Sequence, residues 1–206
     1  MITVGLTGGY ATGKSFVASQ LERLGCHLIY ADSLGRAVQE PGGEAYRPIV
    51  ETFGPEILEV DETINRKKLA SIVFSSPELL AKLNSFVHPA VFRLEEKMLK
   101  QFEVQDPGGI SVIEAAILIE TGRYTAFDRI ILTVCDEAVQ IARALKRDGI
   151  SRAEVLARIA RQLPIEQKRI HAHYVIDTNG SKENTIRQVE AVYEELNQLA
   201  IKRQQA

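Results

Sequence analysis

The most constraining stretch of the chain is Gly8-Gly9-Tyr10-Ala11-Thr12-Gly13-Lys14-Ser15, which fits the pattern Gly-x-x-x-x-Gly-Lys-Ser. It follows a short apolar run, Ile2 to Leu6, and precedes an amphipathic run that starts near Lys14. Between a strand and a helix, this pattern predicts a phosphate-binding loop. The glycines let the backbone aim its N–H groups inward, and the following helix presents its free N–H groups and positive dipole end to an anion.

Two side chains at the end of this loop have predicted roles. We expect Lys14 to reach the β- and γ-phosphates of a nucleotide as a mobile point charge. We expect the Ser15 hydroxyl to hold Mg²⁺, because this hard cation prefers oxygen ligands. The alternative is a glycine-rich turn with a chance lysine, and the strand–loop–helix context argues against it.

Five apolar stretches predict buried parallel strands joined by crossover helices. They are residues 2–6, 27–30, 110–113, 127–134 and 173–176. The expected fold class is therefore α/β: a P-loop NTPase-type five-stranded parallel sheet flanked by helices, with a helical substrate-binding insert and a helical lid.

The insert is expected at residues 33–103, a stretch poor in strand signals. Its last part repeats apolar residues at helical spacing, and we expect His88-Pro89 to kink or split that helix. Such an insert on a nucleotide-binding core predicts an acceptor site. The alternative is a helical layer that serves stability alone.

The lid is expected at residues 139–171. Arg143 and Arg147 lie four residues apart, so they share one helix face, and Ser151 with Glu154 predicts a capping box for a second helix. Arginine side chains can stabilise the charge of a transferring phosphoryl group, although a solvated charged face is the alternative. We expect one kinase unit, 1–206, with its core at 1–32, 104–138 and 172–206.

Acidic residues follow several of the predicted strands. Asp32 comes directly after the second strand, on the sheet edge where open α/β proteins bind ligands, which makes it a candidate general base for a hydroxyl beside the γ-phosphate. Its alternative role is to cap a helix over residues 34–38. Glu114, Glu120 and Asp136 each qualify as a second Mg²⁺ contact, and Asp136 could instead cap the next helix.

Composition excludes several classes of protein. The formal net charge of −2 gives no sign of a general nucleic-acid binder. The longest apolar run is too short for a membrane span, and residues 1–6 are too short for a signal peptide. Cys26 and Cys135 fit no metal-binding spacing, are expected to be buried, and suggest a reducing compartment. We therefore expect a cytoplasmic protein with neither nucleic-acid nor membrane partners.

Several different short motifs follow one another along the chain. They are Gly5-Leu6-Thr7-Gly8-Gly9-x-Ala11-x-Gly13-Lys14-Ser15, Ala31-Asp32-x-Leu34-x-Arg36, Asn65-Arg66-x-x-Leu69, His88-Pro89, Arg143, Arg147, Gln162 and Val175-Ile176-Asp177-x-x-Gly180. Each is weak by itself. In this order and at this spacing, together they resemble the dephospho-coenzyme A kinase family along nearly the whole chain.

The resemblance implies the last step of coenzyme A synthesis, in which ATP phosphorylates the ribose 3′-hydroxyl of dephospho-coenzyme A with Mg²⁺ as the metal. It implies that Asp32 is the base, that Arg143 and Arg147 neutralise the transferring group, and that Arg66 and His88 line the acceptor site. The ATP-binding residues that it implies are Gly8, Gly9, Ala11, Thr12, Gly13, Lys14, Ser15, Phe16, Asn179 and Gly180.

Four positions depart from the family pattern. Phe16 stands at a usual threonine, which leaves Ser15 as the only side-chain oxygen at the end of the loop. Tyr30 and His173 stand at usual aspartates, and Ala116 at a usual proline.

Three alternative functions share parts of this pattern. A kinase of another small alcohol would have the same core and a different insert. A GTP-binding switch would need an Asn-Lys-x-Asp motif after a late strand, and the sequence contains none. A non-catalytic nucleotide-binding module would not need both Lys14 and Asp32.

Overall fold

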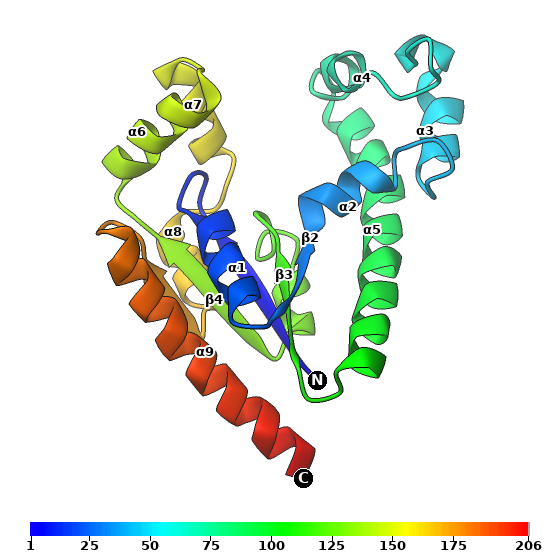
Figure 1. Ribbon diagram of the computed structural model, residues 1–206. Coiled ribbons are helices and arrows are strands. Elements are labelled where there is room, and N and C mark those ends of the chain that lie inside the picture. The colour runs from blue at the N-terminus through cyan, green and yellow to red at the C-terminus, as the bar shows by residue number, and fades with distance from the viewer. Residues whose placement is uncertain (206) are drawn as a thin grey trace. The chain divides into compact units, whose positions relative to one another are not determined.

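A parallel sheet organises the computed structural model, which describes residues 1–205 (Figure 1). Its strand order is β2-β3-β1-β4-β5. The strands are β1 (Ile2–Gly8), β2 (His27–Tyr30), β3 (Ile110–Glu114), β4 (Arg129–Val134) and β5 (Tyr174–Asp177). All five predicted strands and the α/β fold class are confirmed, with small shifts at the strand ends.

The central strands are apolar along their length because helices and turns cover both of their faces. Val4 and Leu6 of β1 and Ile131 and Leu132 of β4 are fully buried. In the register of β1 against β4, Gly8 lies opposite Thr133. The turns that follow these two strands therefore start at the same edge of the sheet.

Two long helices pack on each other and on the sheet. Helix α1 (Lys14–Arg23) contacts β1 and β3, and α9 (Lys182–Gln205) contacts α1, β1, β3 and β5. Their apolar residues recur at helical spacing, and Leu21 of α1 and Leu196 of α9 are fully buried. The remaining helices beside the sheet are η2 (Arg123–Ala126), α6 (Glu137–Asp148), α7 (Arg152–Ala160) and α8 (Ile165–Arg169).

The predicted capping box at the start of α7 is confirmed. The Ser151 hydroxyl accepts from the backbone N–H of Glu154, and the Glu154 carboxylate accepts from the backbone N–H of Ser151. The short helix α8 was not predicted, because its five residues are too few for a hydrophobic period to be recognised.

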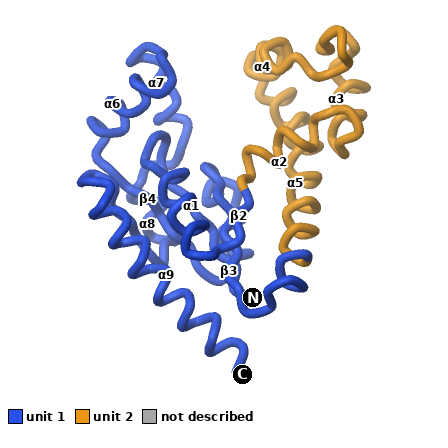
Figure 2. Tube along the Cα trace, viewed as in Figure 1, with its two compact units in different colours: residues 1–29, 101–206 blue, residues 30–100 orange. Residues whose placement is uncertain are grey.

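The chain forms two compact units (Figure 2): residues 1–29 with 101–206, and residues 30–100. The second unit is helical and has its own core, formed by Ile49, Phe53, Ile57, Leu69 and Val73. Its elements are α2 (Ala31–Ala37), α3 (Tyr46–Phe53), η1 (Pro55–Ile57), α4 (Arg66–Val73) and most of α5 (Pro77–Gln105).

Two sequence-based expectations for this helical stretch need correction. Helix α5 runs through Pro89 without being split, because buried residues directly after the proline, Ala90 and Val91, hold the helix across the missing hydrogen bond. Helix α2 begins at Ala31 with Tyr30 as its N-cap. The alternative role of Asp32 as a cap is therefore wrong, since its position is inside the first turn.

The two cysteines differ in environment. Cys26 is buried, as expected, and burial raises the pKa of its thiol to about 12. Cys135 is only half-buried, contrary to the expectation, because it follows the last residue of β4 at the carboxyl edge of the sheet. Within residues 1–205, no helix combines the length and apolarity needed to cross a membrane.

One carboxylate fastens the last turn of α9 to the start of the sheet. Asp128 accepts hydrogen bonds from the backbone N–H and the hydroxyl of Thr3, and from two nitrogens of Arg203 at 2.8 and 2.9 Å. Arg203 also donates to the carbonyl of Met1 at 3.0 Å. Burial by itself raises the pKa of Asp128, but the hydrogen bonds from Arg203 and Thr3 outweigh it and hold that pKa below its usual value.

We expect Asp128→Asn to lower the free energy of unfolding by about 1–3 kcal/mol at pH 7, because charge-assisted hydrogen bonds are lost. The folded carboxyl binds its proton more weakly than the unfolded one, so this stabilisation is present above a pH of about 4 and disappears as the pH falls below it. Urea unfolding at pH 7 and at pH 3 measures both effects.

The control is Glu51→Gln, which breaks an exposed pair with Arg47 and should cost under about 1 kcal/mol. An equal loss for Asp128→Asn at both pH values would contradict the assignment.

Candidate nucleotide-binding site

The turn between β1 and α1 has the backbone of a phosphate-binding loop. A Cβ at Gly8 would lie 2.2 Å from the Thr133 hydroxyl and 2.7 Å from its carbonyl oxygen, so only glycine fits against β4 here. Gly13 has a φ of +87°, in the left-handed region that favours glycine. Gly8 and Gly13 of the motif are therefore required for steric reasons.

Threonine side chains hold this loop against the sheet. The Thr12 hydroxyl lies 2.8 Å from the Thr133 hydroxyl and donates to the carbonyl of Gly9 at 2.8 Å. The Thr178 hydroxyl, in the turn after β5, donates to the carbonyl of Thr12 at 2.9 Å. Because Thr12, Thr133 and Thr178 are all buried, these hydrogen bonds fix the loop without competition from water.

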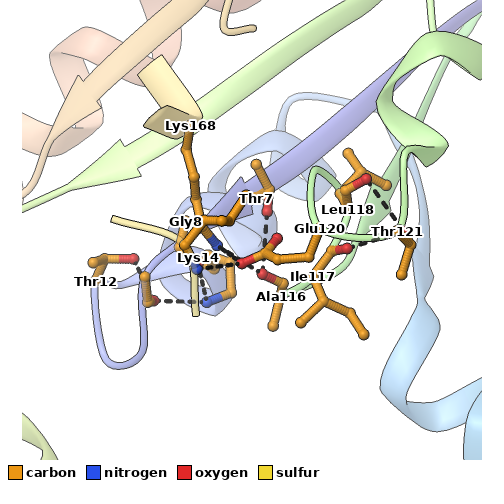
Figure 3. A network of polar contacts seen from close by, with 12 residues as sticks. Thr7, Gly8, Thr12, Lys14, Ala116, Ile117, Leu118, Glu120, Thr121 and Lys168 are labelled. Atoms are coloured by element: carbon orange, nitrogen blue, oxygen red, sulfur yellow. Dashed lines mark hydrogen bonds and ion pairs between the residues drawn. The ribbon is translucent and has the colours of Figure 1, made fainter. Parts of the chain in front are cut away.

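Lys14 folds back over the loop that precedes it. Its ammonium donates to the carbonyls of Gly9 at 2.9 Å and Gly8 at 3.3 Å (Figure 3). The cation is thus held beside the backbone whose N–H groups would receive an anion. The next residue, Ser15, is exposed at the start of α1, so its hydroxyl is accessible to a cation.

Arg143 of α6 reaches the turn after β5. It donates to the Thr178 hydroxyl at 2.9 Å and to the Thr178 carbonyl at 2.5 Å. Thr178 therefore joins three segments: the phosphate loop, β5 and α6. The sequence analysis missed Thr178, because a threonine in a turn gives no signal of long-range contacts.

A cleft of about 290 Å³ lies beside the loop. Its lining residues are Gly13, Phe16, Arg143, Thr178, Gly180, Lys182 and Thr185. The Lys182 ammonium lies 5.6 Å from the centre of the Phe16 ring, a cation–π contact. An aromatic face, a guanidinium and backbone atoms at one cleft are suited to a flat, polar-edged group such as a nucleobase.

Asn179 is anchored beside this cleft. Its side-chain oxygen accepts from the backbone N–H of Asp136 at 2.8 Å, and its amide donates to the Asp136 carboxylate at 3.3 Å. Asp136 occupies the N-cap position of α6, as its alternative role predicted, but its side chain makes no capping hydrogen bond to the helix. Asp136 is one of the three acids predicted as a second Mg²⁺ contact, and its carboxylate is hydrogen-bonded to Asn179.

Arg147 lies one turn further along α6 and has a different partner. It donates to Asp148 from Nε at 2.7 Å and from Nη2 at 2.9 Å. These hydrogen bonds, with one from Tyr10, hold the pKa of Asp148 well below its usual range. Arg143 and Arg147 share one face of α6. Arg143 contacts the turn after β5, and Arg147 contacts Tyr10 of the phosphate loop.

A buried ion pair lies next to the phosphate loop (Figure 3). The ammonium of Lys168, which is fully buried, lies 2.6 Å from Glu120 Oε1 and donates to the carbonyl of Ala116 at 3.2 Å. The Thr7 hydroxyl donates to the same carbonyl, and the N–H of Leu163 donates to Glu120 Oε1 at 3.1 Å. This pair connects the turn after β3, the end of β1 and the segment between α7 and α8.

The second oxygen of the Glu120 carboxylate, Oε2, is buried with no hydrogen-bond partner among residues 1–205. Lys168 therefore offsets the Glu120 charge through the other oxygen, Oε1. Glu120 and Glu114 were also predicted as possible Mg²⁺ contacts. Glu120 forms an ion pair with Lys168, and Glu114 is the last residue of β3. Sequence reasoning missed Lys168, because lysines are rarely buried and periodicity does not single them out.

Three predicted residues belong to the helical unit. Asp32 is exposed in the first turn of α2, and Arg66, at the start of α4, forms an ion pair with Glu40 at 2.9 Å. His88 is half-buried in α5, and burial lowers the pKa of its imidazole, so the ring is neutral at pH 7. The roles of these three residues stay predictions.

The structure accounts for two departures from the family pattern. His173 Nδ1 accepts from the backbone N–H of Ile130 at 3.1 Å, a hydrogen bond that an aspartate oxygen could also accept. At Ala116, the carbonyl receives the hydrogen bonds from Lys168 and Thr7, and proline would offer the same carbonyl. Both substitutions keep the acceptor that their neighbours need.

The site agrees with comparisons to known proteins. The family model described as dephospho-CoA kinase matches residues 2–184. A dephospho-CoA kinase from Geobacter metallireducens is 43% identical over 195 residues, which cover 95% of this chain and 96% of that one.

Two solved structures are similar over nearly their full length. The protein TT1252 from Thermus thermophilus is 33% identical with a TM-score of 0.83, covering 95% of this chain and 97% of that one. A dephospho-CoA kinase from Campylobacter jejuni is 25% identical with a TM-score of 0.70 and the same coverage of both chains.

We expect Lys168→Met to lower the free energy of unfolding by about 3–5 kcal/mol, because it leaves the buried Glu120 charge uncompensated. Adding Glu120→Gln should recover part of that loss, since the carboxylate charge is then removed as well. Guanidinium unfolding followed by circular dichroism measures both variants.

The matched control is Lys100→Met, which breaks an exposed pair with Glu96 and should cost under about 1 kcal/mol. A Lys168→Met variant as stable as this control would show that the buried pair does not hold the turn after β3.

Proposed function

The chain belongs to the dephospho-CoA kinase family, and from this premise we propose how its residues carry the reaction. The enzyme transfers the γ-phosphoryl group of ATP to the ribose 3′-hydroxyl of dephospho-coenzyme A, the final step of coenzyme A biosynthesis. The observation that carries the assignment of roles is the phosphate loop, with Lys14 folded over the carbonyls of Gly8 and Gly9.

Lys14 and the loop N–H groups bind the phosphates of ATP. On binding, the Lys14 ammonium exchanges two neutral carbonyl acceptors for phosphate oxygens, a stronger charge-assisted interaction. Phosphoryl transfer depends mainly on positioning and on stabilising negative charge, so a cation fixed on the loop serves both needs. Loop residues 11–16 and Gly180 complete the nucleotide site.

The residues at the end of the loop suit Mg²⁺. The Ser15 hydroxyl is exposed beside the N-terminus of α1, and Mg²⁺ takes few protein ligands when phosphates and water supply the rest. Residues 1–205 contain no group of three or more acidic, histidine or cysteine side chains arranged for a metal, which fits this mode of binding. When bound, the cation offsets the charge of the phosphates.

Asp32 acts on the acceptor. It follows β2 directly, so its carboxylate comes from a strand end of the sheet that also carries the phosphate loop. It accepts or orients the proton of the ribose 3′-hydroxyl. Arg66 and the neutral imidazole of His88 line the acceptor site, the first as a charge for phosphate and the second as a hydrogen-bonding group.

The lid arginines act on the nucleotide. Arg143 contacts the cleft beside the loop, where Asn179 and Gly180 lie next to the base, and Arg147 neutralises the transferring group. Closure of residues 139–171 over the phosphates keeps water from competing with the acceptor. In this proposal the core carries the phosphate loop and comprises residues 1–32, 104–138 and 172–206. The insert, residues 33–103, binds the acceptor.

The expected location is the cytoplasm, with ATP and dephospho-coenzyme A as partners and no nucleic acid or membrane. Free thiols at Cys26 and Cys135 are compatible with a reducing compartment.

The test of the reaction is acceptor-dependent ATP consumption. With Mg²⁺ and ATP, dephospho-coenzyme A should stimulate ADP release, and mass spectrometry should find a product heavier by one phosphoryl group. Shikimate and adenosine serve as competing alcohols in the same assay. Stimulation by one of them and not by dephospho-coenzyme A would refute the proposal.

Asp32→Asn tests the base. We expect turnover to fall by about 10²–10⁴-fold with the affinity for ATP retained, because proton transfer is lost while the phosphate loop is untouched. Lys14→Ala should instead weaken ATP binding and turnover together. Steady-state kinetics with varied ATP separates the two patterns.

The control for Asp32→Asn is Asp61→Asn, an exposed acid of the same helical unit whose carboxylate accepts from the backbone N–H and the hydroxyl of Thr63. It should leave turnover unchanged. Unchanged turnover in Asp32→Asn would remove Asp32 from its role.

A further inference from the structure

Tyr10, at the tip of the phosphate loop, takes no part in the mechanism above. Its ring packs on a small apolar cluster formed by Ala11, Ile141, Ala144 and Val155. Ile141 and Ala144 belong to α6, and Val155 to α7. A loop residue therefore completes the core between the two lid helices.

The Tyr10 ring also lies beside two arginines. The guanidinium carbon of Arg147 is 5.2 Å from the ring centre, and that of Arg158 is 5.5 Å from it. Both distances are within the range of a cation–π interaction. The ring thus holds one cation from α6 and one from α7 next to the loop.

The Tyr10 hydroxyl adds polar contacts to this arrangement. It donates to Oδ2 of Asp148 and accepts from Arg158 Nη1 at 2.9 Å. Asp148 in turn holds Arg147, and its Oδ2 lies 3.6 Å from Arg158 Nη1. The cluster contains two guanidinium groups and one carboxylate, so it keeps a net positive charge.

We propose that Tyr10 is a positioning residue, which fastens α6 and α7 to the phosphate loop and holds Arg147 and Arg158 beside the nucleotide phosphates. Arg158 is then a further lid cation of the site. The geometry has a physical reason: a phenol supplies a π face for two cations and a hydroxyl for their counter-ion in one side chain. The inference rests on the proposed function, since Arg147 acts there on the transferring group.

This arrangement couples the loop to the lid. Tyr10 is part of the phosphate loop and contacts Arg147 and Arg158 directly. No intermediate residue is needed to hold these two arginines near the phosphates. Loss of the ring leaves the lid helices with weaker attachment, so water gains access to the γ-phosphate. Hydrolysis of ATP without acceptor should then rise relative to transfer.

Two substitutions test the ring and the hydroxyl separately. We expect Tyr10→Leu, which keeps apolar bulk, to raise KM for ATP by about 3- to 30-fold and the ratio of hydrolysis to transfer by a similar factor. Tyr10→Phe keeps the ring and should show a smaller change. The control is Tyr193→Phe, a half-buried tyrosine of α9, which should change neither quantity.

Arg158→Gln tests the second cation. It should raise the ratio of hydrolysis to transfer, whereas Arg152→Gln, an exposed arginine at the start of the same helix, should not. In a double-mutant cycle, Tyr10→Leu and Arg158→Gln should be less than additive, because both remove the same interaction. A merely structural role for Tyr10 would lower stability without changing the ratio.

An unchanged ratio in folded Tyr10→Leu, or additive effects with Arg158→Gln, would overturn the inference. If Tyr10→Leu did not fold by circular dichroism, Tyr10→Phe and Arg158→Gln would decide in its place. Wild-type transfer to dephospho-coenzyme A is measured in the same assay. Transfer by the wild type together with an unchanged ratio in the variants would refute only the role of Tyr10.

Discussion

The phosphate loop depends on buried hydroxyl contacts between three strand ends. Thr12 lies in the loop, Thr133 near the end of β4 and Thr178 just after β5, and their hydrogen bonds join the three segments where water has no access. A phosphate-binding loop has to present its N–H groups in one fixed arrangement, because its affinity comes from dipoles that are already oriented. The hydroxyl contacts supply that rigidity, and the absence of a Cβ at Gly8 allows β4 to approach closely enough for them to form.

A second buried polar group supports the same edge of the sheet. Lys168 and Glu120 hold the turn after β3, and the N–H of Leu163 ties the end of the lid to that turn. Buried ion pairs are weak evidence for stability, since desolvation offsets much of their attraction. Their directional hydrogen bonds do specify one arrangement of the chain, and here that arrangement keeps the lid segment next to the loop.

Much of the fold could be predicted from the sequence, because the signals were local. The five strands are short apolar runs, the phosphate loop is a contiguous motif, and the Ser151 capping box spans four residues. Thr178, Lys168 and Asp148 could not be predicted, since each gains its meaning from partners that lie far away in the chain. Asp32 is a case between these two. Its position after β2 could be predicted from the sequence, whereas its role depends on contacts with the acceptor, which no local pattern encodes.

The contact of Arg203 with the carbonyl of Met1 brings the last turn of α9 within one hydrogen bond of the first residue. β1 runs from that point to the phosphate loop over seven residues, a distance of about 20 Å for an extended strand. Arg203 and the first residue of the sheet therefore lie together at the sheet edge opposite the loop. A substitution at this contact would therefore act on how β1 and α9 are held together, while the nucleotide-binding edge lies a full strand length away.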